Sequence, residues 1–245
     1  MTNLENRTAL ITGAGTGIGA ATAAALAAAG ARVALIGRRA DRIASVAREV
    51  DGAYAAADVT DRAALAAAVG ELRAQVGTFD LVFANAGAML AAPFDTADVG
   101  EWDRMVGVNV TGLLNTARAT IGDLTTAAAH GPADLVLTSS IGAHMVLPGY
   151  AVYTATKAAV THLTTNLRAE FGPRGVRVHA IEPGMTESEL GDHMSDPDAR
   201  EFLRQFTIDN PPIPASAIGD AVVWSTSLPA NVNVASMIVL PTAQG

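Results

Sequence analysis

Short apolar runs alternate with longer segments of helical periodicity along the chain. The runs are β-branched or fully apolar, which is typical of strands covered on both faces of a sheet. They predict strands at Thr8–Thr12, Arg32–Gly37, Ala53–Ala57, Phe79–Ala84, Asp134–Ser139, Val176–Glu182 and Ala235–Leu240. The segments between them predict helices at Gly17–Ala29, Ala40–Val50, Asp61–Val76, Trp102–Ala128 and Val152–Phe171.

Residues that favour helix ends flank several of these segments. Asp61, after Thr60, is a good N-cap, and Gly30 and Gly172 lie where C-terminal glycines belong. A regular strand–helix alternation implies parallel strands joined by right-handed crossovers. We therefore predict an α/β fold, a single doubly wound Rossmann domain over residues 1–245 with a parallel seven-stranded sheet and helices on both faces.

The region Glu187 to Pro214 breaks this rhythm. It contains Gly191, Pro197 and three further prolines at 211, 212 and 214. An insertion before the last strand is where a lid over a substrate crevice would lie, so we predict a substrate lid at 187–214. A surface excursion without a role is the alternative.

Composition narrows the function classes. Half of the residues are hydrophobic and 16% are charged, which is enough to bury a large core. The absence of cysteine excludes disulfides and Cys-ligated metals, and the five histidines are scattered, so we expect no metal site. The formal charge of −8 argues against a nucleic-acid or anionic-membrane partner.

Two long uncharged stretches, Leu135–Thr156 and Ala221–Gly245, could resemble membrane spans. Pro, Gly, Asn and Ser interrupt both, so buried strands with loops are the better interpretation. No signal peptide precedes the first predicted strand. We expect a cytoplasmic protein with no membrane partner.

A glycine loop follows the first strand and opens the first predicted helix. Its glycines at 13, 17 and 19 let the backbone turn tightly and approach a pyrophosphate at the helix N-terminus. A tight structural turn is the alternative, but the position between strand and helix favours nucleotide binding. The candidate contacts are Gly13, Gly15, Thr16, Gly17, Ile18 and Gly19.

The end of the second strand decides which nicotinamide dinucleotide binds. An acidic residue there would bond the ribose hydroxyls, whereas this chain has Arg38 and Arg39, whose guanidinium groups suit a 2′-phosphate. The alternative is a solvated helix start that continues with Arg42. We predict NADP(H), with Asp58 accepting from the adenine amino group and Asn85-Ala86-Gly87 passing close to the adenosine.

Tyr153 and Lys157 lie four residues apart and share one helix face, and Ser140 ends the fifth strand. Carbonyl reduction needs a proton donor at the oxygen, and a free tyrosine has a pKa of about 10. Lowering it to about 7 requires roughly 4 kcal/mol, which one cation about 4 Å away supplies at an effective dielectric of about 20. A surface helix pair is the alternative. Lys157 is the only lysine, and it would follow one of three tyrosines at this spacing by chance roughly 1% of the time.

These motifs occur in the order and at the spacing of one family. Over essentially its whole length, the chain resembles the short-chain dehydrogenase/reductases, in a bacterial NADP-dependent branch that reduces small hydroxy- and oxo-compounds or natural-product aldehydes. The matching elements are Thr12–Gly19, Asp58-Val59, Asn85-Ala86-Gly87, Val108-Asn109-Val110, Ser140, Tyr153/Lys157 and Pro183-Gly184. The branch is suggested by Gly37-Arg38-Arg39, Glu182-Pro183-Gly184 with Glu189-Leu190, and Leu240-Pro241-Thr242.

The resemblance implies a catalytic tetrad of Asn109, Ser140, Tyr153 and Lys157. It implies that the backbone carbonyl of Asn109 positions a water in a proton relay to Lys157. It also implies that Lys157 bonds the nicotinamide ribose. Further implied cofactor contacts are Val59, Val108, Pro183, Gly184, Thr186 and Ser188. A homo-oligomer is also implied, a tetramer rather than a dimer, packing 102–128 and 152–171 against their copies. Two departures, Ala84 for an Asn and Ser188 for a Thr, leave the implied activity untouched.

The predicted substrate pocket is mostly apolar and favours a carbonyl compound with an apolar portion. It comprises Ser140, 142–147 (with Gly142, His144 and Met145), Tyr150, Ala91-Ala92, Met185, Leu190 and Met194. His144 either contacts substrate or has a structural role, the commoner case for a lone His in an apolar loop. We predict an NADP(H)-dependent oxidoreductase that transfers a hydride between the nicotinamide and a ketone, aldehyde or secondary alcohol. An epimerase or dehydratase on this scaffold and a non-catalytic dinucleotide-binding regulator are the alternatives.

Overall fold

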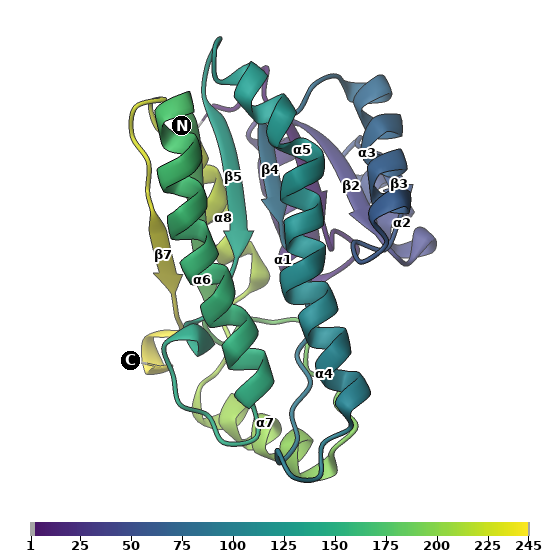
Figure 1. Ribbon diagram of the computed structural model, residues 1–245, viewed down its shortest axis with the longest axis vertical. Coiled ribbons are helices and arrows are strands. Elements are labelled where there is room, and N and C mark those ends of the chain that lie inside the picture. The colour runs from purple at the N-terminus through teal and green to yellow at the C-terminus, as the bar shows by residue number, and fades with distance from the viewer. Residues whose placement is uncertain (1–2, 245) are drawn as a thin grey trace.

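A single parallel sheet of seven strands organises the chain in the computed structural model, which describes residues 3–244 (Figure 1). The strand order is β3-β2-β1-β4-β5-β6-β7, so the order reverses between β1 and β4. The strands are β1 (Thr8–Thr12), β2 (Arg32–Gly37), β3 (Ala53–Ala56), β4 (Leu81–Ala84), β5 (Ala133–Thr138), β6 (Val176–Pro183) and β7 (Ser236–Val239). The predicted doubly wound fold is confirmed.

Helices cover both faces of the sheet. They are α1 (Gly17–Ala28), α2 (Ala40–Glu49), α3 (Arg62–Val76), α4 (Val99–Val106), α5 (Leu113–Ala127), α6 (Ala151–Phe171), α7 (Pro197–Asp209) and α8 (Ala215–Thr226). Alternate residues of the central strands enter two cores, as the period of a strand requires. Leu10 packs with α3, α5 and α6, whereas its neighbour Ile11 packs with α1, α2 and α8.

Two helices differ from the sequence-based expectation. Helix α8 forms where we predicted only strands and loops, because it is apolar on nearly every side and Ile218 and Val222 are fully buried in the core that it shares with α1. The predicted 102–128 helix instead begins at Val99, where Asp98 accepts a 2.9 Å hydrogen bond from the Gly100 N–H. It is divided by a π-helix at Gly107–Gly112.

The predicted helix ends are partly correct. The Asp61 carboxylate accepts 3.0 Å hydrogen bonds from the backbone N–H groups of Ala63 and Ala64, and Gly30 has φ +97°. Gly172 is the C-cap of α6, as we expected, although its φ of −55° is right-handed. The chain continues from it through a short 3₁₀ turn with Pro173, and Gly175 then adopts φ +83°.

A buried charge cluster ties together the amino ends of β1, β5 and β6. Asp134 is fully buried, and its carboxylate oxygens lie 2.6 Å from Arg7 Nη2, 2.7 Å from Arg177 Nη2 and 2.8 Å from His179 Nε2. Burial alone would raise the pKa of Asp134, but the hydrogen bonds from His179 and Arg177 and the charge of Arg7 lower it below its usual value. Within residues 3–244, no helix is long and apolar enough to span a membrane.

Candidate active site

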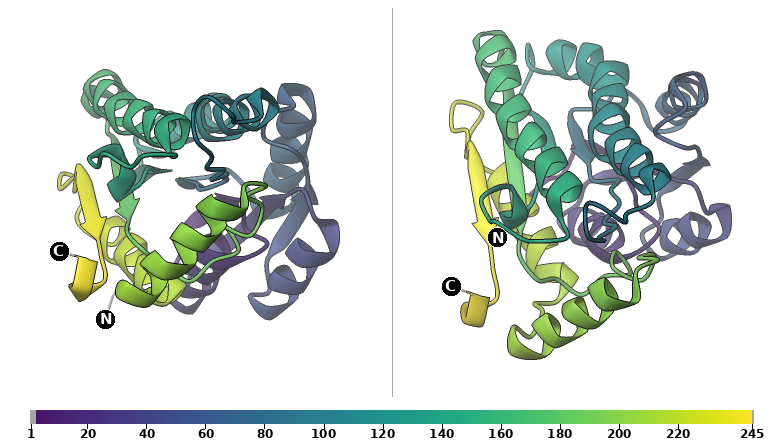
Figure 2. Two further views of the ribbon diagram at one scale, coloured as in Figure 1. Left: turned by 90° about the horizontal axis from the view of Figure 1, so that it is seen from below. Right: turned by 60° about the horizontal axis from the view of Figure 1, so that its bottom comes forward.

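A cavity of about 1110 Å³ lies at the carboxyl ends of the strands. Figure 1 shows α7 at this end of the sheet, and the left view of Figure 2, seen from below, shows α7 lying across that end. The residues that follow six strands line the cavity: Gly13, Gly15 to Ile18, Arg38 and Arg39, Asp58, Asn85 to Gly87, Ser139 to Gly142, and Gly184. This is where a doubly wound sheet binds its ligands, at the point where the strand order reverses.

The glycine loop is closed against the chain that follows β4. A Cβ on Gly13 would lie 2.8 Å from the Ala86 Cα, and one on Gly19 would lie 2.2 Å from the Gly13 carbonyl oxygen. Gly13 and Gly17 also have φ +67° and +53°, which favours glycine. The Asn85 amide donates to the Thr12 and Gly13 carbonyls at 3.2 and 3.4 Å and fixes the loop. Gly19 is therefore packed inside the loop and does not itself line the cavity.

Two arginines stand at the outer end of the cavity. The side chains of Arg38 and Arg39 are 57% and 47% exposed, so their guanidinium groups are accessible to a ligand. Arg38 Nη1 lies 3.9 Å from the Asp58 carboxylate, and Arg39 Nη2 lies 3.0 Å from that of Glu189. Burial opposes ionisation of Asp58, but hydrogen bonds from Thr60 and the charge of Arg38 lower its pKa.

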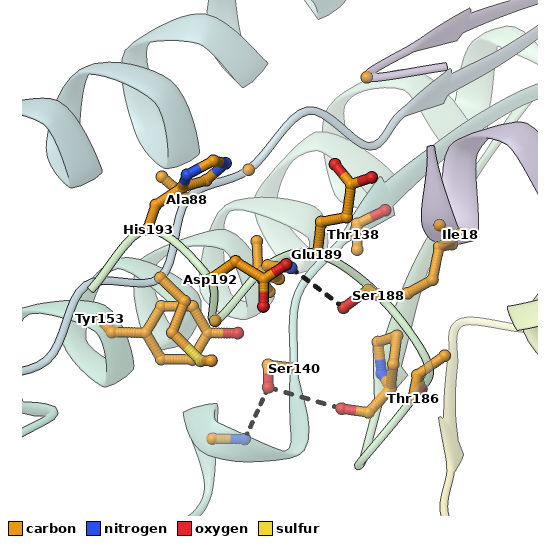
Figure 3. A pocket seen from close by; sticks show the side chains of 18 of the residues that line it. Ile18, Ala88, Thr138, Ser140, Tyr153, Thr186, Ser188, Glu189, Asp192 and His193 are labelled. Atoms are coloured by element: carbon orange, nitrogen blue, oxygen red, sulfur yellow. Dashed lines mark hydrogen bonds between the residues drawn. The ribbon is translucent and has the colours of Figure 1, made fainter. Parts of the chain in front are cut away.

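Ser140, Tyr153 and Lys157 meet at the inner end of the cavity, where their exposed fractions are 8%, 7% and 5%. Figure 3 shows Tyr153 and Ser140 on the same side of the cavity. The Gly142 N–H donates to Ser140 Oγ at 3.0 Å. Lys157 Nζ donates to the Thr138 carbonyl at 3.0 Å and lies 5.8 Å from the centre of the Tyr153 ring.

The electrostatics of this group differ from our expectation. Burial raises the pKa of Tyr153, and only the hydrogen bond with Ser140 opposes that shift. Burial also lowers the pKa of Lys157 to about 8. The expected lowering of the Tyr153 pKa by Lys157 is therefore wrong for the protein alone, because desolvation of the buried phenol dominates.

Asn109 lies in the π-helix and is only 1% exposed, and its side chain does not line the cavity. Its Oδ1 accepts from the Ala88 N–H at 2.8 Å, and its Nδ2 donates to the Ala88 carbonyl at 2.9 Å and to Thr156 Oγ1 at 3.0 Å. Thr156 in turn donates to the Tyr153 carbonyl at 2.7 Å. Asn109 thus fastens the chain after β4 to the helix that carries Tyr153 and Lys157. No pattern in the sequence indicated the part of Thr156 in this chain of hydrogen bonds.

Seven of the predicted substrate-pocket residues line the cavity, namely Ser140, Gly142, Met145, Leu147, Tyr150, Met185 and Leu190, whereas Ala143 and Val146 do not. His144 does not, because its Nε2 lies 2.7 Å from a carboxylate oxygen of buried Glu182. Met194 does not either, because it is 3% exposed and belongs to the hydrophobic core. Ala91 and Ala92 are also outside the lining.

Sequence reasoning missed one wall of the cavity. Helix α7 contributes Phe202, Leu203 and Phe206, and the Phe202 ring centre lies 6.1 Å from those of Tyr150 and Phe206. Phe202, Leu203 and Phe206 lie one and three residues apart, so an amphipathic pattern on 197–209 was the available signal.

The predicted cofactor residues Val59 and Val108 line the cavity, as do Pro183, Gly184, Thr186 and Ser188. The Thr186 hydroxyl donates to the Gly184 carbonyl at 3.0 Å, and Ser188 Oγ accepts from the Leu190 N–H at 3.4 Å. Figure 3 shows Ile18 beside Ser188 and Thr186. Residues 3–244 contain no group of three His, Asp or Glu side chains that could hold a metal ion.

The fold and this cavity define a dinucleotide-binding protein, and comparison with known proteins narrows the class. The profile of the family described as short chain dehydrogenase matches residues 7–199. An uncharacterized oxidoreductase of Staphylococcus haemolyticus is 34% identical over 244 residues, covering 98% of this chain and 100% of that protein. The chain belongs to the short-chain dehydrogenase/reductase family of oxidoreductases.

Solved structures agree with this assignment. The alcohol dehydrogenase of the archaeon Thermococcus sibiricus, complexed with 5-hydroxy-NADP, has a TM-score of 0.86 at 26% identity over 98% of both chains. A 3-ketoacyl-(acyl-carrier-protein) reductase from Brucella melitensis, complexed with NADH, has a TM-score of 0.89 at 28% identity over 98% of this chain and 99% of that one. These complexes support a nicotinamide dinucleotide as the cofactor of the chain.

Proposed function

We propose that the protein is an NADP(H)-dependent oxidoreductase that moves a hydride between the nicotinamide and a ketone, aldehyde or secondary alcohol carbon. The observation that carries this proposal is the buried group of Ser140, Tyr153 and Lys157 at the inner end of a cavity with two arginines at its outer end. The cavity is large enough to hold a dinucleotide together with a small-molecule substrate.

The residues of the cavity fit the cofactor. The glycine loop leaves no room for a Cβ at Gly13 or Gly19, so its backbone would approach the pyrophosphate closely. Arg38 and Arg39 would hold the 2′-phosphate, since no acidic residue occupies the end of β2. Asp58 would accept from the adenine, Lys157 would bond the ribose, and Thr186 and Ser188 would bind the carboxamide. When bound, the cofactor supplies or accepts the hydride.

Tyr153 is assigned as the general acid. Because burial raises its pKa, the phenol is protonated near neutral pH and suited to donate a proton to a carbonyl oxygen. Ser140 would hold that oxygen by a hydrogen bond. Lys157, with a pKa of about 8, is mostly charged at pH 7 and would stabilise the phenolate left by proton transfer. The Asn109 carbonyl would position a water that returns a proton through Lys157.

The walls of the cavity favour a substrate with an apolar or aromatic portion. Met145, Leu147 and Tyr150 form one side, and Phe202 and Phe206 of α7 form the other. The segment 187–214 would act as the lid that completes this pocket.

We also propose a homo-oligomer, a tetramer rather than a dimer. Val99, Val106 and Leu114 expose apolar side chains along α4 and α5, and Trp224 and Ile238 do so at α8 and β7. Light scattering at several concentrations tests this assembly, and a monomer throughout would contradict it.

The experiment that tests the function is NADPH consumption with a panel of ketones and aldehydes. The proposal expects one NADPH oxidised for each alcohol formed, with NADPH preferred to NADH. Product formed with no net change in NADPH would instead favour an epimerase or dehydratase. Tight cofactor binding with no turnover of any compound, isomerisation included, would favour a regulator.

A further inference from the structure

An ion pair closes the outer end of the cavity and connects the proposed lid to the cofactor-binding region. Glu189 lies near the start of 187–214, and its carboxylate is 3.0 Å from Arg39, which follows β2. The same Arg39 nitrogen lies 3.3 Å from the Thr16 hydroxyl of the glycine loop. Both charged residues line the cavity.

The start of the segment also rests directly on the glycine loop. A Cβ added to Gly17 would lie 3.2 Å from the Cβ of Ser188, so the two backbones are close to contact. Figure 3 shows Ser188 and Glu189 adjacent where the segment crosses the cavity near Ile18. A change at Glu189 therefore affects the position of the segment as well as the local charge.

Arg39 faces two competing anions once the proposed cofactor is considered. Its guanidinium group is one of the two proposed to bind the 2′-phosphate, yet Glu189 occupies one edge of it in this structure. The pair is about half exposed, and such pairs contribute little, whereas an arginine–phosphate contact is charge-assisted and bidentate. A phosphate with two negative charges would also repel the Glu189 carboxylate.

We propose that Glu189 is a cofactor-discriminating residue that couples the 2′-phosphate to the lid. This inference rests on the proposed NADP(H) function. Without a 2′-phosphate, Glu189 holds Arg39 and fastens the start of 187–214 over the cavity. A bound 2′-phosphate takes Arg39 and releases the segment, whereas a ligand without that phosphate leaves the ion pair intact.

Two adenosine nucleotides test this coupling without any turnover. Adenosine 2′,5′-bisphosphate carries the 2′-phosphate, and AMP lacks it. Glu189→Gln removes the competing charge, so adenosine 2′,5′-bisphosphate should bind about 2- to 5-fold more tightly, an amount that corresponds to the weak pair. AMP should bind all forms equally. The matched control is Glu187→Gln, since Glu187 lines the same cavity and forms no ion pair with residues 3–244.

Limited trypsin cleavage reports whether the segment 187–214 is held or released, because Arg200 and Arg204 are exposed on α7 within that segment. In wild type, adenosine 2′,5′-bisphosphate should accelerate cleavage at these sites and AMP should not. Glu189→Gln should be cleaved at the faster rate even without ligand, and Glu187→Gln should behave as wild type.

The outcomes separate the two proposals. If wild type binds adenosine 2′,5′-bisphosphate no more tightly than AMP, the NADP(H) assignment fails and the coupling fails with it. If it binds the bisphosphate more tightly, but Glu189→Gln matches Glu187→Gln in affinity and cleavage, the NADP(H) assignment stands and the role of Glu189 is overturned.

Discussion

Replacing Lys157, the single lysine, by methionine measures how much unfolding free energy is lost by burying an ammonium group in the proposed catalytic site. Burial lowers the pKa of Lys157 from 10.5 to about 8. The difference of about 2.5 units, at 1.36 kcal/mol per unit, is a penalty of about 3 kcal/mol for holding the ammonium in the folded protein. Methionine has a similar length and no charge, so Lys157→Met removes this penalty. It also leaves the Thr138 carbonyl without its 3.0 Å donor, which costs about 1–3 kcal/mol.

The pH dependence separates the two contributions. Between pH 8 and 10.5 the unfolded chain binds the Lys157 proton and the folded chain releases it, so the unfolding free energy of wild type rises with pH in that window. Below pH 8 both states hold the proton and the penalty is present in full. We expect the advantage of Lys157→Met over wild type to fall by about 3 kcal/mol from pH 7 to pH 10.5.

Urea denaturation of the cofactor-free proteins at several pH values gives this difference. No other lysine titrates in the window, and the tyrosines are common to both proteins. Lys157→Arg is the control, because it keeps a charge that does not titrate below pH 12. Parallel stability curves for wild type and Lys157→Met from pH 7 to 10.5 would refute the reasoning.

Three further predictions follow from the site and the fold. Tyr153→Phe should keep cofactor affinity while kcat falls by roughly 10²- to 10⁴-fold, and a folded variant with more than about a tenth of wild-type kcat would contradict the role of Tyr153 as the acid. Arg38→Asp should lower the ratio of kcat/KM for NADPH over NADH by roughly 10- to 150-fold at one ionic strength, and replacing Arg39 as well should lower the ratio further. A wild type that prefers NADH would exclude the assignment of NADP(H) as the cofactor. Asp134→Asn should lower the unfolding free energy by about 3–5 kcal/mol in urea denaturation, because it removes the charge facing Arg7, Arg177 and His179. Asp123→Asn, which breaks the more exposed pair with Arg73, should cost less than about 1 kcal/mol, and equal losses in the two variants would contradict a special role for the buried cluster.

The features that the sequence predicted are those with a local cause. Each strand is a run of four to eight residues that is mostly apolar, and alternation with helices is enough to imply a parallel sheet. The glycine loop was recognisable because its glycines have a backbone reason, such as the 2.2 Å approach that a Cβ on Gly19 would make to Gly13. Tyr153 and Lys157 shared a helix face by spacing alone.

The features that it missed depend on contacts between distant segments. Helix α8 has only a narrow polar face to reveal its period, because it packs beside α1 and against the sheet. The hydrogen bond of Asn109 with Ala88 and the pairing of His144 with Glu182 join residues 21 and 38 positions apart in the chain. The direction of the Tyr153 pKa also depends on burial, which the motif does not encode.

The two ends of the sheet show why an arginine suits one buried position and the lysine another. At the amino end, Arg177 donates to the carbonyls of Leu228, Pro229 and Val232 from one nitrogen and to Asp134 and Thr226 from the other. A planar fork with five donors satisfies such a set, and an ammonium group with three donors does not. At the carboxyl end, a pKa of about 8 leaves Lys157 able to gain and lose a proton near neutral pH, which a guanidinium group cannot do. Arg177 therefore serves where a fixed charge must form many bonds, and Lys157 stands where we propose that a proton moves.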